Sequence, residues 1–177
     1  MYVTLGGAPK REDFVGLLLE CHERIRAFSR LAVEVGARVD LQAPEVVEAC
    51  RRCERYFTEA LPRHVEDEEE TLLPGLRGRS VEVDEALTVM HAQHEAHRPL
   101  LIDLLAALGD VRLVPGDLAL RPRLATVAER VRQDFEAHLS LEERVLFPAV
   151  TATWSAEQSA RAVEALRARR RPAVDAS

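Results

Sequence analysis

The chain has 177 residues, of which 47% are hydrophobic, 31% charged and 5% aromatic, and its formal net charge is −6 at pH 7. This length is typical of one domain with a substantial core. The negative charge argues against nucleic acid as a partner. No apolar run approaches the ~20 residues that span a bilayer, so no membrane segment is expected. Residues 1–13 lack the basic-then-apolar layout of a secretory signal, so a cytoplasmic location is expected.

Apolar residues recur at spacings of three and four almost throughout the chain, which is the period of an α-helix. Caps, glycines and prolines divide this pattern into four long helices. They are expected from the N-cap Asp13 to Gly36, from Pro44 to Pro74, from Asp84 to just before Gly109, and from Asp117 to Phe147. Pro62, Pro99 and Pro122 fall inside these patterns, and each should kink its helix or mark its first turn.

A short fifth helix is expected after Pro148. Ser155 and Gln158 have the spacing of a capping box, and this helix should end near the arginines at 169–171. No strand pattern competes, so the sequence predicts an all-α fold, an up-down-up-down antiparallel four-helix bundle with a short C-terminal fifth helix. We expect a single domain over residues 1–170, with a four-helix core at about 12–148, an extra helix at about 155–170 and a flexible tail at 171–177.

One motif occurs twice in the chain. Residues 64–74 read HVEDEEETLLP and residues 138–148 read HLSLEERVLFP, so His, two Glu, Leu and Pro recur at the same offsets. Histidine and glutamate four residues apart lie on one face of a helix. Mixed imidazole and carboxylate donors suit iron better than calcium, magnesium or a thiolate zinc site. The repeat therefore predicts a metal site built between helices.

Six polar residues lie on the helix faces that should form the core. An unpaired ionised carboxylate in a core costs several kcal/mol, so such groups are paired, protonated or bound to metal. The residues predicted to bind metal are His22, His64, Glu68, His94, His138 and Glu142. In an antiparallel bundle with the expected helix ends, all four of these histidines lie about 15 Å from one end of the molecule, in one layer.

Four neighbours of these residues have two interpretations each. His91 and His97, three residues to either side of His94, could add ligands, or they could be hydrogen-bond partners or solvated residues. Glu69 and Glu143 occupy matching positions of the repeat. They could accept hydrogen bonds from imidazoles or lie at the edge of the helix face, and the second interpretation is favoured.

Other residues with possible chemistry have a simpler interpretation. Glu66, Asp67 and Glu70 are expected to form an ordinary solvated face. Cys50 and Cys53 form a C-x-x-C on the apolar stripe of a helix, and no second such pair completes a zinc site. Both cysteines are therefore expected to be buried as small hydrophobic residues.

These motifs resemble the hemerythrin-like HHE cation-binding family, over roughly residues 12–148. The resemblance rests on His22 followed by Ile25-Arg26, on His94 followed by Arg98, and on the doubled H-x-x-x-E-E-x-x-L-x-P. It implies a four-helix bundle with a non-haem di-iron centre that carries an oxo or hydroxo bridge. It further implies terminal iron ligands at His22, His64, His94 and His138, and bridging carboxylates at Glu68 and Glu142.

The sequence departs from the oxygen-carrying branch of that family, which has H-x-x-x-H on the third helix and H-x-x-x-x-D on the fourth. With fewer histidines at the irons, more coordination positions would be open. We therefore expect a protein that binds, senses or reacts with oxygen, nitric oxide or hydrogen peroxide, or that handles iron; carrier, sensor and enzyme remain alternatives. Two further alternatives are a ferritin-like di-iron oxidase, whose Glu-x-x-His order is the reverse of the order here, and a non-catalytic helical-bundle signalling module.

Overall fold

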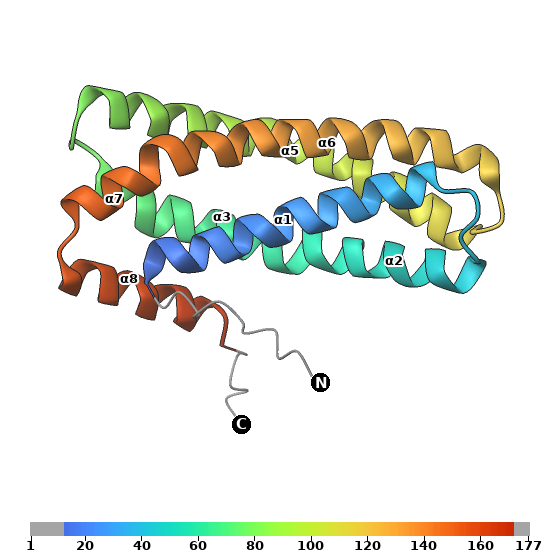
Figure 1. The fold of residues 1–177 in the computed structure, drawn as a ribbon, viewed down its shortest axis with the longest axis horizontal. Coiled ribbons are helices and arrows are strands. Elements are labelled where there is room, and N and C mark those ends of the chain that lie inside the picture. The colour runs from blue at the N-terminus through green and yellow to red at the C-terminus, as the bar shows by residue number, and fades with distance from the viewer. Residues whose placement is uncertain (1–12, 172–177) are drawn as a thin grey trace, which may run out of the picture.

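The computed structural model of the protein describes residues 13–171, which are helical apart from short connections and contain no strand (Figure 1). The helices are α1 (Phe14–Ala37), α2 (Ala43–Arg55), α3 (Leu61–Asp67), α4 (Leu73–Leu76), α5 (Val81–Leu113), α6 (Arg121–Leu141), α7 (Phe147–Thr153) and α8 (Ala156–Arg169). Three π-helical turns, η1 (Tyr56–Ala60), η2 (Glu68–Leu72) and η4 (Glu142–Leu146), and a 3₁₀ turn, η3 (Leu118–Leu120), complete the set. Apart from Arg171, the tail expected at 171–177 lies outside the described residues.

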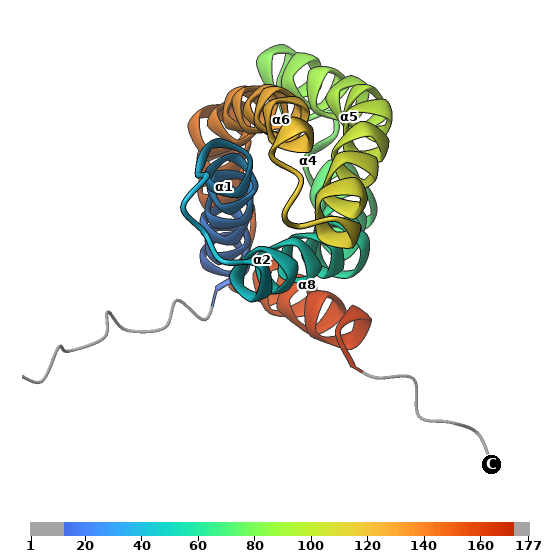
Figure 2. The ribbon, with the colours of Figure 1, turned by 90° about the vertical axis from the view of Figure 1, so that its right-hand side faces the viewer.

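The long elements form a helical bundle. α2 continues through η1, α3 and η2 into α4, and α6 continues through η4 into α7, so each series is one interrupted rod beside the continuous helices α1 and α5. α1 packs against α2 and α6, and α5 packs against the same two helices (Figure 2). α8 lies outside this ring, against α1 and α3. None of the described helices is long and apolar enough to cross a membrane.

Some helix ends differ from those expected. α5 starts three residues earlier than Asp84, because the side chain of Ser80 accepts a hydrogen bond from the backbone N–H of Val83 and caps the helix. It also continues through Gly109 to Leu113. A glycine inside a helix costs only about 1 kcal/mol relative to alanine, and the neighbouring Leu108 and Val111 are fully buried, so packing outweighs the penalty.

Three prolines follow the π turns, each two residues beyond the end of the turn. Pro62 follows η1, Pro74 follows η2 and Pro148 follows η4. A proline lacks an N–H and its ring clashes with the carbonyl four residues earlier, and a wider turn relieves both problems without ending the rod. This is why the fourth rod continues past Phe147 to Thr153. Pro122 lies in the first turn of α6, whereas Pro99 lies inside α5.

The apolar core consists of two clusters separated by a polar layer. One cluster includes Ile25, Leu61, Leu104 and Phe135, and also contains Cys50 and Cys53, which are fully buried as expected. The other cluster is built from residues such as Phe14, Leu18, Leu72, Met90 and Leu146. In the sequence of the first three rods the predicted metal-binding residues fall between the members of the two clusters, and in the fourth rod Glu142 does so while His138 directly precedes Leu139 of the first cluster. The fold therefore holds polar groups between two apolar blocks, where water has little access.

Candidate metal centre

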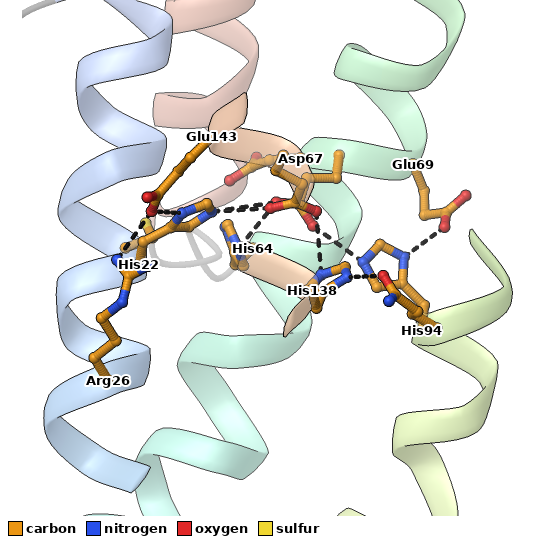
Figure 3. A network of polar contacts seen from close by, with 12 residues as sticks. His22, Arg26, His64, Asp67, Glu69, His94, His138 and Glu143 are labelled. Carbon is orange, nitrogen blue, oxygen red and sulfur yellow. Dashed lines mark hydrogen bonds and ion pairs between the residues drawn. The ribbon is translucent and has the colours of Figure 1, made fainter. Parts of the chain in front are cut away.

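All four rods contribute polar side chains to this layer (Figure 3). α1 carries His22, α3 carries His64, α5 carries His94 and α6 carries His138. Glu68 and Glu142 are the first residues of η2 and η4, so each carboxylate stands where a π turn begins. All six side chains are buried, and both glutamates are fully so. The structure thus brings together the six residues singled out in the sequence.

The six residues form two groups that share their carboxylates. The first group is His22, His64, Glu68 and Glu142, and the second is Glu68, His94, His138 and Glu142. Within each group the potential ligand atoms lie within 4.8 Å of one another. Each group therefore offers two imidazole nitrogens and two carboxylates to one position.

Each carboxylate directs one oxygen to each group. Oε1 of Glu68 lies 2.9 Å from Nε2 of His64, and its Oε2 lies 3.2 Å from Nε2 of His94. Oε2 of Glu142 lies 3.0 Å from Nε2 of His22, and its Oε1 lies 3.1 Å from Nε2 of His138. A carboxylate arranged in this way can contact two cations at once, one through each oxygen.

The hydrogen bonding of these atoms fits cation binding. Although the distances between nitrogen and oxygen are short, both carboxylates lack hydrogen-bond partners among the described residues. The buried atoms left without a hydrogen-bond partner include Nε2 of His22, His64 and His94 and both carboxylate oxygens of Glu68 and Glu142. Buried polar atoms are normally satisfied, and a converging set of unsatisfied nitrogen and oxygen donors is satisfied by a metal ion. The donor set is one that transition metals accept.

Two of the imidazoles are held by a carboxylate at Nδ1, the ring nitrogen that does not face the site. Oε1 of Glu143 lies 2.8 Å from Nδ1 of His22, and Oε1 of Glu69 lies 2.6 Å from Nδ1 of His94. Because a carboxylate only accepts, the Nδ1–H of each ring donates, which leaves Nε2 free to face the site. The expectation that Glu69 and Glu143 are edge residues is therefore wrong. Their matching places in the repeat were the signal for a shared role.

The amide of Gln93 holds a third imidazole. Its Oε1 lies 2.9 Å from Nδ1 of His138, across the contact between α5 and α6. Gln93 was not predicted from the sequence, because nothing in its local pattern shows which helix it faces. Arg26 supports the carboxylate of Glu143. Its guanidinium donates to Glu143 at 2.9 Å and to Glu136 at 3.0 and 3.1 Å.

Three further residues near the site belong to neither group. The side chain of His91 is 58% exposed and pairs with Glu69, and His97 is buried against the rings of Phe135 and His138. Neither histidine belongs to either group of potential metal ligands. Asp67 was expected on a solvated face, but it is fully buried. That expectation is wrong because α8 covers this side of α3.

The family model of the hemerythrin HHE cation-binding domain matches residues 13–150, which is most of the chain. The chain belongs to this family. No curated protein matches it. The matched part of the hemerythrin domain contains all six residues of the two groups, whereas α8 lies beyond it.

The electrostatics of this hemerythrin domain favour a cation at the site. Burial and repulsion from Glu68 raise the pKa of Glu142 to about 7. Burial opposes ionisation of Glu68 as well, but the imidazoles of His64 and His22 outweigh it and hold the pKa of Glu68 well below its usual range. Burial likewise disfavours the charged form of His22, but Glu142 and Glu68 raise its pKa to about 9. Protons and cations therefore compete for the same nitrogen and oxygen atoms.

A cavity of about 410 Å³ adjoins the second group of this domain. It lies between α3 and α5, and its walls include Phe57, Leu61, Leu101 and Phe135. His94 also lines it, so the cavity and the second group share a side chain. A small molecule in this apolar cavity would lie beside the imidazole of His94.

Proposed function

We propose that this hemerythrin domain binds a pair of iron ions. His22 and His64 would hold one ion, His94 and His138 the other, and Glu68 and Glu142 would bridge them. The observation that carries the proposal is the division of each carboxylate between the groups, with one oxygen within 3.2 Å of an imidazole nitrogen on either side. The proposal includes the up-down-up-down arrangement of four rods, which short connections and the packing of each rod on two others support.

The donor set favours iron over other cations. Calcium and magnesium prefer oxygen ligands, and structural zinc sites use thiolates. Here four imidazoles accompany only two carboxylates. A ferritin-like oxidase would instead place Glu-x-x-His pairs and additional glutamates around its irons, so it remains the less favoured alternative. A non-catalytic signalling module would leave the unsatisfied buried atoms of both groups unexplained.

We further propose that the ligand is a small diatomic molecule or a peroxide. Two imidazoles and two carboxylate oxygens per ion leave coordination positions for a further ligand, as in other non-haem iron sites. When bound, the iron pair supplies these positions and electrons for oxygen, nitric oxide or hydrogen peroxide. The chain contributes the cavity beside His94, whose surface is mainly apolar and which offers a small molecule a route to this imidazole. Glu69 and Glu143 keep the imidazoles in one tautomer and orientation.

Elemental analysis of the iron-loaded protein tests the first step, and two irons per chain are expected from the two groups. The protein loaded anaerobically is then exposed separately to oxygen, nitric oxide and hydrogen peroxide, and its absorption spectrum is followed. A spectral change that reverses under vacuum indicates a carrier, a lasting change with nitric oxide or oxygen indicates a sensor, and loss of added peroxide indicates an enzyme. Iron retention without response to any of the three ligands indicates iron handling. A chain that holds no iron refutes the proposal.

A further inference from the structure

α8 covers the side of the bundle that carries the first group. It packs against α1 and α3, which bear His22 and His64. It lies beyond residues 13–150, so the family match does not account for it. Two arginines at its C-terminal end, Arg169 and Arg170, turn towards α3.

Both arginines pair with one buried carboxylate. Nη1 of Arg169 lies 2.9 Å from Oδ1 of Asp67, and Nη2 of Arg170 lies 2.6 Å from Oδ2. Asp67 is fully buried, so its charge needs these partners. Arg169 also donates to the hydroxyl of Thr71 at 3.0 Å. The end of α8 is therefore fixed to the turn that joins α3 to η2.

The same arginines contact two residues that are adjacent in sequence to predicted metal-binding residues. Asp67 immediately precedes Glu68 and follows His64 by three residues. Nη2 of Arg170 also lies 3.7 Å from Sγ of Cys21, the residue before His22. Nδ1 of His64 has no hydrogen-bond partner among the described residues. His64 thus differs from the other three histidines, whose Nδ1 atoms face an oxygen acceptor.

We propose that Arg169 and Arg170 are positioning residues that hold His64 and Glu68 in place and slow the release of the cation at the first group. The proposal rests on the proposed function, because it requires a cation at that group. Successive helix residues point about 100° apart. Anchoring Asp67 to α8 therefore fixes the rotation of this turn about its axis, and with it the inward direction of Glu68.

The effect should be confined to one cation. His94 and His138 lie on α5 and α6 and have their own partners in Glu69 and Gln93. Glu68 contributes to both groups, but at the second group His94, His138 and Glu142 remain in place. Weakening the contacts of α8 should therefore accelerate loss of one iron and leave the other largely unchanged.

The experiment measures the release of iron from the full-length loaded protein to an excess of chelator. Asp67→Asn and Arg170→Gln are compared with the wild type. Arg161→Gln is the control, because Arg161 lies on α8 and, within residues 13–171, pairs only with the exposed Glu157. Disturbing residues behind a ligand typically weakens metal binding 10- to 100-fold, so we expect release of one iron to be about tenfold faster in both variants. The absorption spectrum of the loaded variants should also shift, and the control should match the wild type.

A second control separates positioning from general stability. Val131→Ala removes buried methyl groups from the distant apolar cluster and should lower the melting temperature without changing iron release or the spectrum. The proposal is overturned if Asp67→Asn and Arg170→Gln both release iron like the wild type. It is also overturned if Val131→Ala, at a similar loss of melting temperature, accelerates release equally. A wild type that never holds two irons would instead refute the proposed function.

Discussion

The carboxylate of Glu143 offers a sharp test of how the imidazoles are held. Glu143→Gln keeps the shape of the side chain but removes the charge that accepts the Nδ1–H of His22 at 2.8 Å. Loss of such a partner lowers metal affinity about 10- to 100-fold, which is about 1.4 to 2.8 kcal/mol. The side chain of Glu143 is 29% exposed and also pairs with Arg26, so solvent screening should place the effect near tenfold.

Competition with a chelator of known affinity measures this change. The matched control is Glu136→Gln, because Glu136 pairs with the same Arg26 at 3.0 Å but makes no contact with a histidine of the site. We expect weaker binding of the iron at the His22 group in the first variant and unchanged binding in the control. Iron affinities equal to that of the wild type in both variants would show that Glu143 does not support His22. Equal losses in both would assign the effect to Arg26 instead.

Three further predictions concern the ligands, the pH dependence and the packing. His64→Ala and His138→Ala should each lower iron content to about one ion per chain or less, because each removes a donor from one group, whereas His91→Ala should keep both ions, as measured by elemental analysis. In chelator-treated protein, the pKa of His22 is about 9 in the folded state and about 6.5 in the unfolded state. Protonation of His22 therefore stabilises the fold, and this contribution is fully present below pH 6.5. That contribution is lost as the pH rises to 9, while iron affinity rises over the same window; unfolding and binding titrations measure both. Gly36→Ala should destabilise the fold by about 1–3 kcal/mol in denaturant unfolding, because its methyl group would clash with the backbone of Ala125 in α6.

Each of these predictions has a result that would contradict it. Retention of two irons by both histidine variants would mean that the ligands have been misassigned. A flat stability curve between pH 6.5 and 9 would show that His22 gains no proton on folding. Gly116→Ala is the control for the packing prediction, since nothing lies within 4 Å of its added methyl group. Equal stability of the two alanine variants would show that α1 and α6 can separate slightly at no cost.

The sequence could predict that the metal-binding side chains meet, because this depends on residue spacing within the helices. His and Glu four residues apart share a helix face whatever the ends of that helix are. α5 begins at Val81 and α7 ends at Thr153, both different from the sequence expectation, yet the four histidines still meet. Helix ends depend on caps such as Ser80 and on packing, which the periodicity does not contain.

Contacts between distant parts of the chain were not predictable in the same way. Asp67 has the sequence context of a solvated residue, and only the packing of α8 against α3 reveals that it is buried. Gln93 and Glu69 acquire their roles from the helices opposite them. The π turns at Glu68 and Glu142 had one local signal, the proline that closes each repeat, and it could have been interpreted as a widened turn.

Anomalous diffraction at the iron absorption edge, from crystals of the iron-loaded protein, tests the central claim most directly. The account predicts two peaks, one among His22, His64, Glu68 and Glu142 and the other among Glu68, His94, His138 and Glu142. Both carboxylates should lie between the two peaks. A single peak, or peaks away from these side chains, would contradict it.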